Sequence, residues 1–204
     1  MSLADLQSRA MLRQRLREQR NGSTAATRIA AATGLAAQLL PLIENRPPGY
    51  LAGYWAVDGE LPLHALISRL PTDCVYCLPV LHVDRCLRFA PWRAGNPIAV
   101  NRFGIPEPQV SESSLLLAQQ MQTVLLPMLG FDRLGNRLGM GGGWYDRSLE
   151  FRKHSQAEPL LVGVGYAFQQ ADLGAAADWD VPLDFIATER ELIDCRSIRA
   201  SHSE

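Results

Sequence analysis

TVLLPML (123–129) is a short apolar run, and the glycine-rich stretch GFDRLGNRLGMGGGWYD (130–146) follows it directly. The run predicts a buried strand, and helical spacing resumes in YDRSLEFRK (145–153). A strand, a glycine loop and a helix in this order are typical of α/β proteins, which bind ligands beyond the ends of their strands. This stretch therefore indicates the fold class and provides the first candidate for a functional site.

Strands and helices alternate along the rest of the chain. Several strands are apolar on both faces, as in a mostly parallel sheet covered by helices on both sides. We therefore predict a three-layer α/β fold in a single domain, residues 1–204. The expected helices are 2–20, 24–44, 61–70 and 145–153, the expected strands are 50–57, 74–81, 87–92, 123–129, 160–168 and 184–189, and 96–110, with its three prolines, is expected to be irregular.

Composition excludes several classes of protein. The 204 residues are 47% hydrophobic and 20% charged, which is ordinary for a soluble globular chain. The net charge of −1 argues against a nucleic-acid binder. The single lysine, Lys153, precedes His154, so a P-loop is absent. No apolar run approaches the roughly 18 residues of a membrane span, and no signal peptide is evident, so we expect a cytoplasmic protein without a membrane partner.

The cysteines predict no redox or metal site. Cys74 and Cys77 form a C-x-x-C pair, but the pair lies in the expected strand CVYCLPVL (74–81). Side chains three positions apart on a strand point to opposite faces. Cys86 and Cys195 complete no second pair with metal-ligand spacing, and we expect all four to be structural.

The glycine loop has the chemistry of a phosphate site. Consecutive glycines at 141–143 allow backbone N–H groups to converge on an anion, and Arg133 and Arg137 add positive charge. The expected helix after the loop would present its positive end. The loop is not a dinucleotide fingerprint, because Trp144 and Asp146 stand where the last glycine of that motif would fall.

Two further groups of residues are candidates for binding. Arg9, Arg13 and Arg17 are spaced i, i+4, i+8 and share one face of the first helix, where an anion such as a polyphosphate would relieve their repulsion. Trp55 and Glu60 lie at the end of the first expected strand. An aromatic ring and a carboxylate suit a flat, amino-bearing heterocycle, although a core tryptophan and a surface glutamate would look the same in sequence.

Acidic residues near the loop are candidates for Mg²⁺, which takes one or two carboxylates together with nucleotide phosphate oxygens. Asp146 ends the glycine loop and Asp184 precedes the last expected strand, with Asp132 as a third candidate. The sequence does not choose among the three.

Together these motifs are similar to those of a known family. R-x-x-L-R (9–13), GELPLHALI (59–67), the glycine loop, LVGVGYAFQ (161–169) and WDVPLDFIATE (179–189) occur in the family's order. Over about residues 5–192 the chain resembles the 5-formyltetrahydrofolate cyclo-ligases, also called 5,10-methenyltetrahydrofolate synthetases. The glycine-loop motif is the most specific of them.

The resemblance implies an ATP-dependent ring closure. The formyl oxygen of 5-formyltetrahydrofolate would take the γ-phosphoryl group of ATP, N10 would attack the resulting iminium phosphate, and loss of phosphate would leave 5,10-methenyltetrahydrofolate. ATP and Mg²⁺ are the implied cofactors and the small folate is the only partner implied, with no nucleic acid; a monomer is expected. The implied fold is a three-layer α/β sheet of the ribose-5-phosphate isomerase and CoA-transferase kind.

The resemblance also implies roles for individual residues. Arg137, Tyr145 and Asp146 would be catalytic, Asp146 and Asp184 would hold Mg²⁺, and Trp55, Glu60 and Tyr145 would bind the folate. The ATP-binding residues would be Arg9, Arg13, Arg137, Leu138, Gly139, Met140, Gly141, Gly142, Gly143, Trp144 and Tyr145. The chain departs from the family at Arg9, where lysine is frequent, at Met140 and Gly142, where some members are basic, and at Trp55, where some are aliphatic.

Two other functions fit the same motifs. One is a related ATP-dependent ligase acting on another small substrate, since a fold and a phosphate loop do not determine the substrate. The other is a non-catalytic folate- or nucleotide-binding relative. A position of Trp55 and Glu60 remote from the glycine loop would remove the support for folate.

Overall fold

The computed structural model describes residues 3–154, 158–174 and 177–201. The α-helices in these ranges are α1 (Leu3–Asn21), α2 (Ala25–Glu44), α3 (His64–Ile67), α4 (Trp144–Ser148) and α5 (Cys195–Ser201), and the 3₁₀ helices are η1 (Glu112–Ser114), η2 (Ala118–Gln120), η3 (Glu150–Lys153) and η4 (Ala167–Gln169). The strands are β1 (Gly49–Ala52), β2 (Cys74–Leu81), β3 (Leu87–Pro91), β4 (Ile98–Val100), β5 (Pro106–Pro108), β6 (Thr123–Pro127), β7 (Gly130–Phe131), β8 (Arg137–Leu138), β9 (Leu160–Val164), β10 (Phe185–Ala187) and β11 (Leu192–Asp194).

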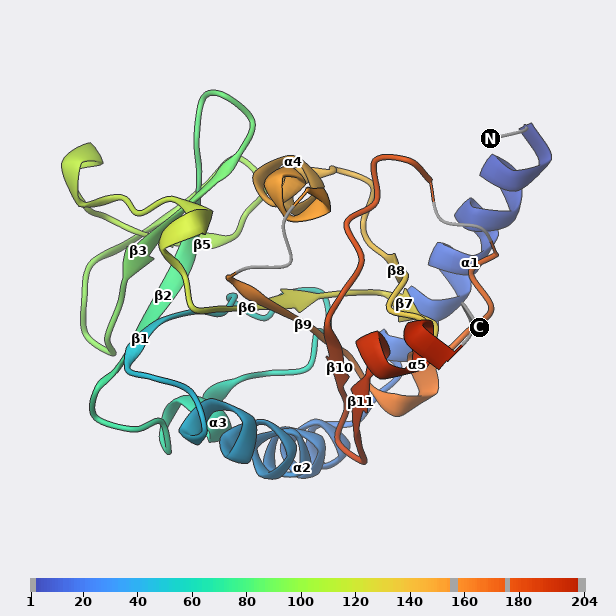
Figure 1. Ribbon diagram of the computed structural model, residues 1–204, viewed down its shortest axis with the longest axis horizontal. Coiled ribbons are helices and arrows are strands. Elements are labelled where there is room, and N and C mark those ends of the chain that lie inside the picture. Colours follow the sequence, from blue (N-terminus) through green and yellow to red (C-terminus); the bar gives the residue numbers. More distant parts are fainter. Residues whose placement is uncertain (1–2, 155–157, 175–176, 202–204) are drawn as a thin grey trace.

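Seven strands form one sheet in the order β11-β10-β9-β6-β1-β2-β3. The five inner strands are mutually parallel, and β11 and β3 pair antiparallel at the two edges. Helices α2 and α3 lie on one face and α4 on the other (Figure 1). The predicted three-layer, mostly parallel α/β fold is therefore confirmed.

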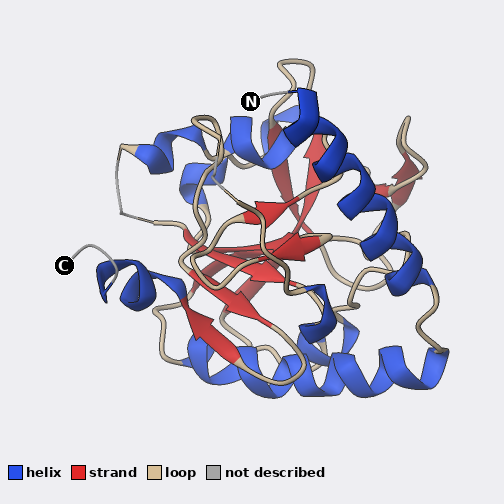
Figure 2. Ribbon diagram, turned by 90° about the vertical axis from the view of Figure 1, so that its right-hand side faces the viewer, coloured by secondary structure: helices blue, strands red, loops and turns tan. Residues whose placement is uncertain are grey.

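Both faces of the sheet are buried, which explains why the strands are apolar throughout. Successive residues of β6 alternate between two cores: Val124 and Leu126 pack on the α4 side, whereas Leu125 packs on the α2 side. Leu161 and Val162 of β9 divide between the same two cores. The strands consequently run through the middle of the molecule between helical layers (Figure 2).

Helix α2 supplies the main cover for one face. Thr24 accepts a hydrogen bond from the Thr27 N–H at its start, as an N-cap residue does. Its buried residues are Ala31, Ala32, Leu35, Ala36, Leu39, Leu40 and Ile43. By length and composition alone this helix could cross a membrane, which corrects the expectation that no stretch is apolar enough. Its apolar face is instead used against the sheet.

The connections that follow β1 and β6 cross to opposite faces of the sheet, although the two strands are parallel neighbours. From β1 it passes through α3, on the α2 side, to β2. From β6 it passes through α4, on the other side, to β9. Because the two connections diverge, the loops beyond the carboxyl ends of β1 and β6 are separated. In open α/β sheets, ligands commonly bind in the crevice at such a point.

Several elements differ from their predicted extents. Strand 50–57 ends at Ala52, and the helix expected over 145–153 is divided into the five-residue α4 and the 3₁₀ helix η3. The proline-rich stretch 96–110 contains the antiparallel hairpin β4–β5. Strand β11 and helix α5 were not predicted, because both are short and their stability comes from pairing with β10 and packing beside it.

The cysteines agree with their predicted structural role. Cys77 is buried in the core on the α4 side, and Cys74 packs against the core on the opposite side of the sheet. Burial raises the pKa of Cys77 to about 12, whereas a redox-active thiol needs a lowered pKa. The described residues contain no cluster of three or more side chains that could hold a metal ion.

Leu39→Ala should lower the free energy of unfolding by about 2–5 kcal/mol, because Leu39 is fully buried between α2 and the sheet. Ile29→Ala on the same helix is the matched control, because Ile29 is 60% exposed and its loss should cost within about 0.5 kcal/mol. Urea denaturation of both variants measures the difference. Equal losses would contradict the assignment of the buried face.

Candidate active site

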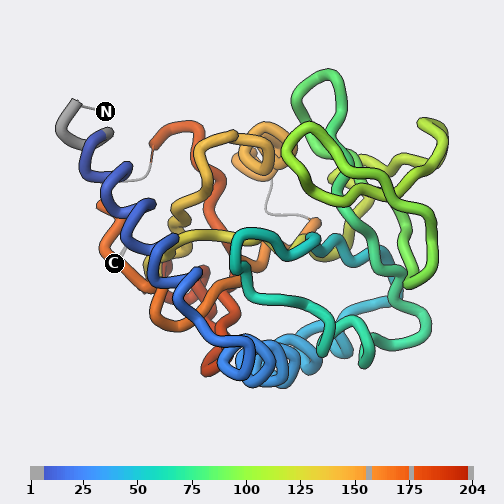
Figure 3. Tube along the Cα trace, turned by 180° about the vertical axis from the view of Figure 1, so that it is seen from behind, coloured from blue at the N-terminus to red at the C-terminus, as the bar shows by residue number. Residues whose placement is uncertain are grey.

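Two loops meet beyond the carboxyl ends of β1 and β6. The first, residues 53–60, carries Trp55 and Glu60, and the second contains the hairpin β7–β8 and the glycines 139–143. Helix α1 runs along the side of the molecule next to the β7–β8 segment (Figure 3). Leu16 of α1 holds it there by packing with Leu138 in a small apolar cluster. The elements that carry the predicted site residues are therefore brought together.

The glycine loop presents its backbone openly. Gly141 has a φ of 91°, a left-handed conformation that favours glycine. A side chain at Gly139 or Gly141 would meet no atom within 4 Å, so a ligand can approach the main chain at both positions. Helix α4 after the loop is only five residues long, and the predicted contribution of a helix end is consequently small. The loop itself is left as the anion-binding element.

Arginines of α1 surround this loop. Arg13 Nε donates a hydrogen bond to the Gly139 carbonyl oxygen at 2.9 Å, and Arg9 forms an ion pair with Asp180 at 3.7 Å. Burial and, secondly, the charge of Arg9 lower the pKa of Arg13. Arg17 extends to the other loop, where its Nε lies 2.8 Å from Asp58 Oδ2. The predicted arginine face is thus directed at the two loops, and the cluster at Arg9 and Arg13 is electrostatically suited to an anion.

Arg137 and Asp146 form one unit beside the loop. The Arg137 guanidinium donates hydrogen bonds to Asp146 Oδ1 and to the Val181 carbonyl oxygen. The Arg137 side chain is buried, whereas the Asp146 side chain is about one quarter exposed. Arg137 therefore orients Asp146 while leaving its carboxylate accessible, and it joins the loop to the segment around Val181.

The two other candidate metal ligands are engaged elsewhere. Asp184 is buried, and its Oδ2 accepts hydrogen bonds from Arg152 and from the Leu161 N–H, both at 2.8 Å. It precedes β10, at the opposite end of the strand from the carboxyl edge. Asp132 accepts hydrogen bonds from Leu134 N and from Asn136 within its own turn. All three carboxylates therefore have structural partners, and Asp146 differs in that it lies in α4, which directly follows the glycines 139–143.

Glu60 is a largely buried carboxylate in the first loop. Its side chain is 10% exposed, and Oε2 accepts the Val57 N–H at 3.1 Å. Burial raises the pKa of Glu60 to about 7. The charge of Glu60 in turn contributes, after burial, to a raised pKa of Tyr145 and of Tyr54. The turn that carries Glu60 lies close to the glycine loop, because Arg17 contacts both Asp58 of that turn and Met140 of the loop.

Aromatic rings cluster around Trp55. The rings of Trp55 and Trp92 are 5.7 Å apart in an edge-on arrangement, and Tyr76 lies 6.5 Å from Trp92. Gly53 permits this, because a Cβ there would lie 2.2 Å from the Tyr76 hydroxyl. Trp92 and Tyr76 were not predicted, since each reads locally as an ordinary strand residue.

Arg20 is the other residue that the prediction missed. It is 1% exposed, and its Nη1 lies 3.9 Å from Glu60 Oε1. The signal was present in the sequence, because Arg20 lies three residues after Arg17 and continues the same helical stripe.

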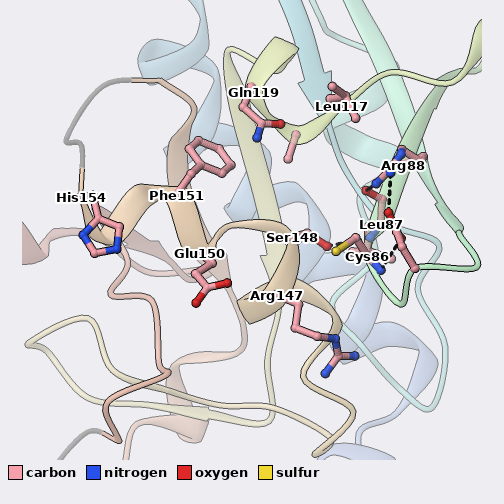
Figure 4. A pocket seen from close by; sticks show the side chains of 12 residues that line it. Cys86, Leu87, Arg88, Leu117, Gln119, Arg147, Ser148, Glu150, Phe151 and His154 are labelled. Atoms are coloured by element: carbon pink, nitrogen blue, oxygen red, sulfur yellow. Dashed lines mark hydrogen bonds and ion pairs between the residues drawn. The ribbon is translucent and has the colours of Figure 1, made fainter.

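A separate cavity of about 480 Å³ lies between β3, η2, α4 and η3 (Figure 4). Its lining combines Arg147 and Arg88 with Glu150, Phe151 and His154, and it includes none of the predicted site residues. Arg147 nevertheless connects this cavity to the glycine loop, because its guanidinium donates a hydrogen bond to the Gly142 carbonyl oxygen at 2.8 Å.

The fold and these residues define an α/β protein with arginines beside an open glycine loop and a buried carboxylate close to the same loop. The model of the 5-formyltetrahydrofolate cyclo-ligase family matches residues 5–189. The chain belongs to the 5-formyltetrahydrofolate cyclo-ligase family, and it is an enzyme of that family.

Individual relatives agree over most of their length. The 5-formyltetrahydrofolate cyclo-ligase of Haemophilus influenzae is 36% identical over 181 residues, which is 87% of this chain and 95% of the relative. The Escherichia coli K12 enzyme of the same name is 34% identical over 142 residues, 68% of this chain and 76% of the relative. The structure is similar to that of Aquifex aeolicus 5,10-methenyltetrahydrofolate synthetase, with a TM-score of 0.77, 26% identity and coverage of 92% and 93% of the two chains.

Asp184→Asn should lower the free energy of unfolding by about 3–5 kcal/mol, because it removes the negative charge from the buried Arg152–Asp184 ion pair. Glu191→Gln is the matched control: it breaks the exposed ion pair with Arg133 and should cost less than about 1 kcal/mol. Chemical denaturation measures both. If the variant keeps its stability but loses activity, Asp184 is supported as a metal ligand instead.

Proposed function

We propose that this chain catalyses the ATP-dependent cyclisation of 5-formyltetrahydrofolate to 5,10-methenyltetrahydrofolate, with release of ADP and phosphate. The observation that carries the proposal is that Arg17 of α1 contacts both loops, at Asp58 and at Met140, so the turn with Glu60 lies next to a glycine loop with open backbone. Membership of the family supports the same reaction.

The nucleotide half is built from the glycine loop and α1. The backbone of Gly139–Gly143 and the adjoining Leu138, Trp144 and Tyr145 would surround the phosphates. Arg9 and Arg13 would add positive charge from α1, where their mutual repulsion is relieved by an anion. Arg13 now bonds the Gly139 carbonyl oxygen, so it is already positioned at the edge of the loop.

The residues present fit Mg²⁺ with one protein carboxylate. Mg²⁺ on a nucleotide usually keeps several waters and takes one or two carboxylates with the phosphate oxygens. Asp146 has an accessible carboxylate oriented by Arg137, whereas Asp184 is committed to Arg152. Mg²⁺ would supply neutralisation of the charge on the transferring phosphoryl group.

The folate half would use Trp55 and Glu60. The indole gives the heterocycle an apolar face, and the ionised carboxylate can accept its N–H groups. Tyr145 lies in α4, which directly follows the glycines 139–143, so it would contribute to both the nucleotide and the folate halves.

The chemistry needs no enzyme nucleophile. The formyl oxygen attacks the γ-phosphorus as ADP leaves, and N10 then attacks the formyl carbon. Loss of the N10 proton and of phosphate completes the ring. Positioning and electrostatic stabilisation account for most catalysis of phosphoryl transfer, and the arginines and Asp146 supply both here.

We further propose a monomeric, cytoplasmic enzyme whose partners are small molecules. The net charge of −1 supports the absence of a nucleic-acid partner. The burial of one face of α2 against the sheet supports a role for that helix in the core rather than in a membrane.

Purified protein mixed with 5-formyltetrahydrofolate and Mg-ATP should form methenyl product and ADP in equal amounts, followed by methenyl absorbance and a coupled ADP assay. Asp146→Asn should reduce turnover by at least about 100-fold, because it removes the oriented carboxylate. Asp73→Asn is the control, since Asp73 is exposed before β2, at the opposite edge of the sheet. ADP release without methenyl product would favour a ligase with another substrate, and binding without turnover would favour a non-catalytic relative.

Arg13→Gln should raise the KM for ATP by about 10- to 100-fold, the value of a charge-assisted hydrogen bond, and leave the KM for the folate unchanged. Arg15→Gln is the matched control on the same helix, because Arg15 is exposed. Initial-rate kinetics in both substrates measure the effect. An equal change in the KM for ATP in the two variants would contradict a role for Arg13 in nucleotide binding.

A further inference from the structure

The turn that carries Glu60 has an unusual backbone. Asp58 and Gly59 have φ values of 52° and 77°, and the left-handed region is uncommon for a residue other than glycine. The Asp58 carboxylate is held from α1 by Arg17 Nε at 2.8 Å, Arg20 Nη2 at 3.1 Å and Asn21 Nδ2 at 3.4 Å. The last turns of α1 therefore hold the 57–60 turn in place.

Arg20 is far more buried than this anchoring requires. Arg17 makes the shorter bond to Asp58 from an exposed position. Arg20, in contrast, is 1% exposed, and its Nε and Nη1 have no hydrogen-bond partner among the described residues. Burying a guanidinium is costly unless an anion compensates it. Its second anion is Glu60, whose Oε1 lies 3.9 Å from Arg20 Nη1.

We propose that Arg20 is a positioning residue for folate binding: buried against the 57–60 turn, it favours the ionised form of the Glu60 carboxylate that would accept the heterocycle N–H groups. This inference rests on the proposed function. Arg20 touches neither substrate in this arrangement and acts through Glu60.

Charged and titratable groups face Glu60 from three elements and from its own turn. They are Arg20 of α1, Asp58 of the turn, Tyr54 beyond β1 and Tyr145 of α4. The pKa of Glu60 is raised to about 7, chiefly by burial, and the charge of Asp58 acts in the same direction. The Val57 N–H and the charge of Arg20 lower it. Arg20 is therefore the cationic group that opposes protonation of Glu60 near neutral pH.

The ionisation state decides what Glu60 can bind. An ionised carboxylate accepts two N–H groups, whereas a protonated one donates from one oxygen. Loss of the Arg20 charge removes an influence that lowers the pKa, so the pKa of Glu60 rises. At pH 7 a smaller fraction is then ionised, and the fraction recovers as the pH increases through the new pKa.

The first test follows the ionisation of Glu60 without any substrate. Protein labelled with ¹³C at glutamate carboxyls is titrated by NMR, and Glu60→Gln identifies the Glu60 signal. We expect a higher pKa of Glu60 in Arg20→Gln, a return toward the wild-type pKa in Arg20→Lys, and no change in the control Arg15→Gln. An unchanged pKa of Glu60 in Arg20→Gln overturns the inference.

The second test measures binding of 5-formyltetrahydrofolate by calorimetry between pH 6 and 9. At pH 7, Arg20→Gln should weaken binding about 5- to 10-fold, with wild-type affinity recovered near pH 9. The double variant Arg20→Gln/Glu60→Gln should bind 5-formyltetrahydrofolate with the same pH dependence as Glu60→Gln alone. A loss that is equal at every pH indicates a merely structural role for Arg20 and overturns the inference.

Two outcomes remain distinguishable. If Arg20→Gln does not fold, Arg20→Met, which also removes the charge, takes its place in both tests, and a Glu60 pKa equal to that of wild type overturns the inference. If the Glu60 pKa responds to Arg20 but wild-type protein binds no 5-formyltetrahydrofolate, the proposed function fails while the coupling between Arg20 and Glu60 is supported.

Discussion

The site depends on one constraint, which is that the connections after β1 and β6 cross to opposite faces of the sheet. Adjacent parallel strands with such connections leave a crevice at their carboxyl ends, and this crevice follows from the path of the backbone. The residues that follow β1 provide Trp55 and Glu60, and those that follow β6 provide the glycine loop. Two segments more than 60 residues apart in sequence are thereby brought side by side by sheet topology alone.

Much of this arrangement could be predicted, because it follows from local patterns that reflect burial on both faces. Apolar strands between helices predict a covered parallel sheet, and β6 followed by glycines predicts where a ligand binds. The arginine stripe of α1 was recognised from its helical spacing. Contacts between distant residues were not predicted: Trp92 joins Trp55 only because β3 pairs antiparallel with β2 at the edge of the sheet.

Asp184 shows where reasoning from residue type falls short. An aspartate before a short strand has the right chemistry for Mg²⁺, and the sequence contains no local sign of its partner. That partner, Arg152, is 32 residues earlier, in a 3₁₀ helix that was expected to be regular α-helix. The same shortening of α4 removes the predicted helix-end contribution at the glycine loop. Both differences arise because the tertiary contacts of 144–153, not its helical propensity, determine its backbone.

Helix α1 connects the two halves of the site by charge. Phosphoryl transfer requires positive charge around the nucleotide, whereas recognition of heterocycle N–H groups requires a negative carboxylate close by, and these two demands oppose each other. One helix meets both, since Arg9 and Arg13 lie near the glycine loop and Arg20 lies under Glu60, with Leu16 packed between them on Leu138. Docking of α1 through Leu16 therefore places both sets of arginines together. In the proposed site the buried Arg20 favours the ionised form of Glu60, and Arg9 and Arg13, nearer the start of α1, are left beside the glycine loop.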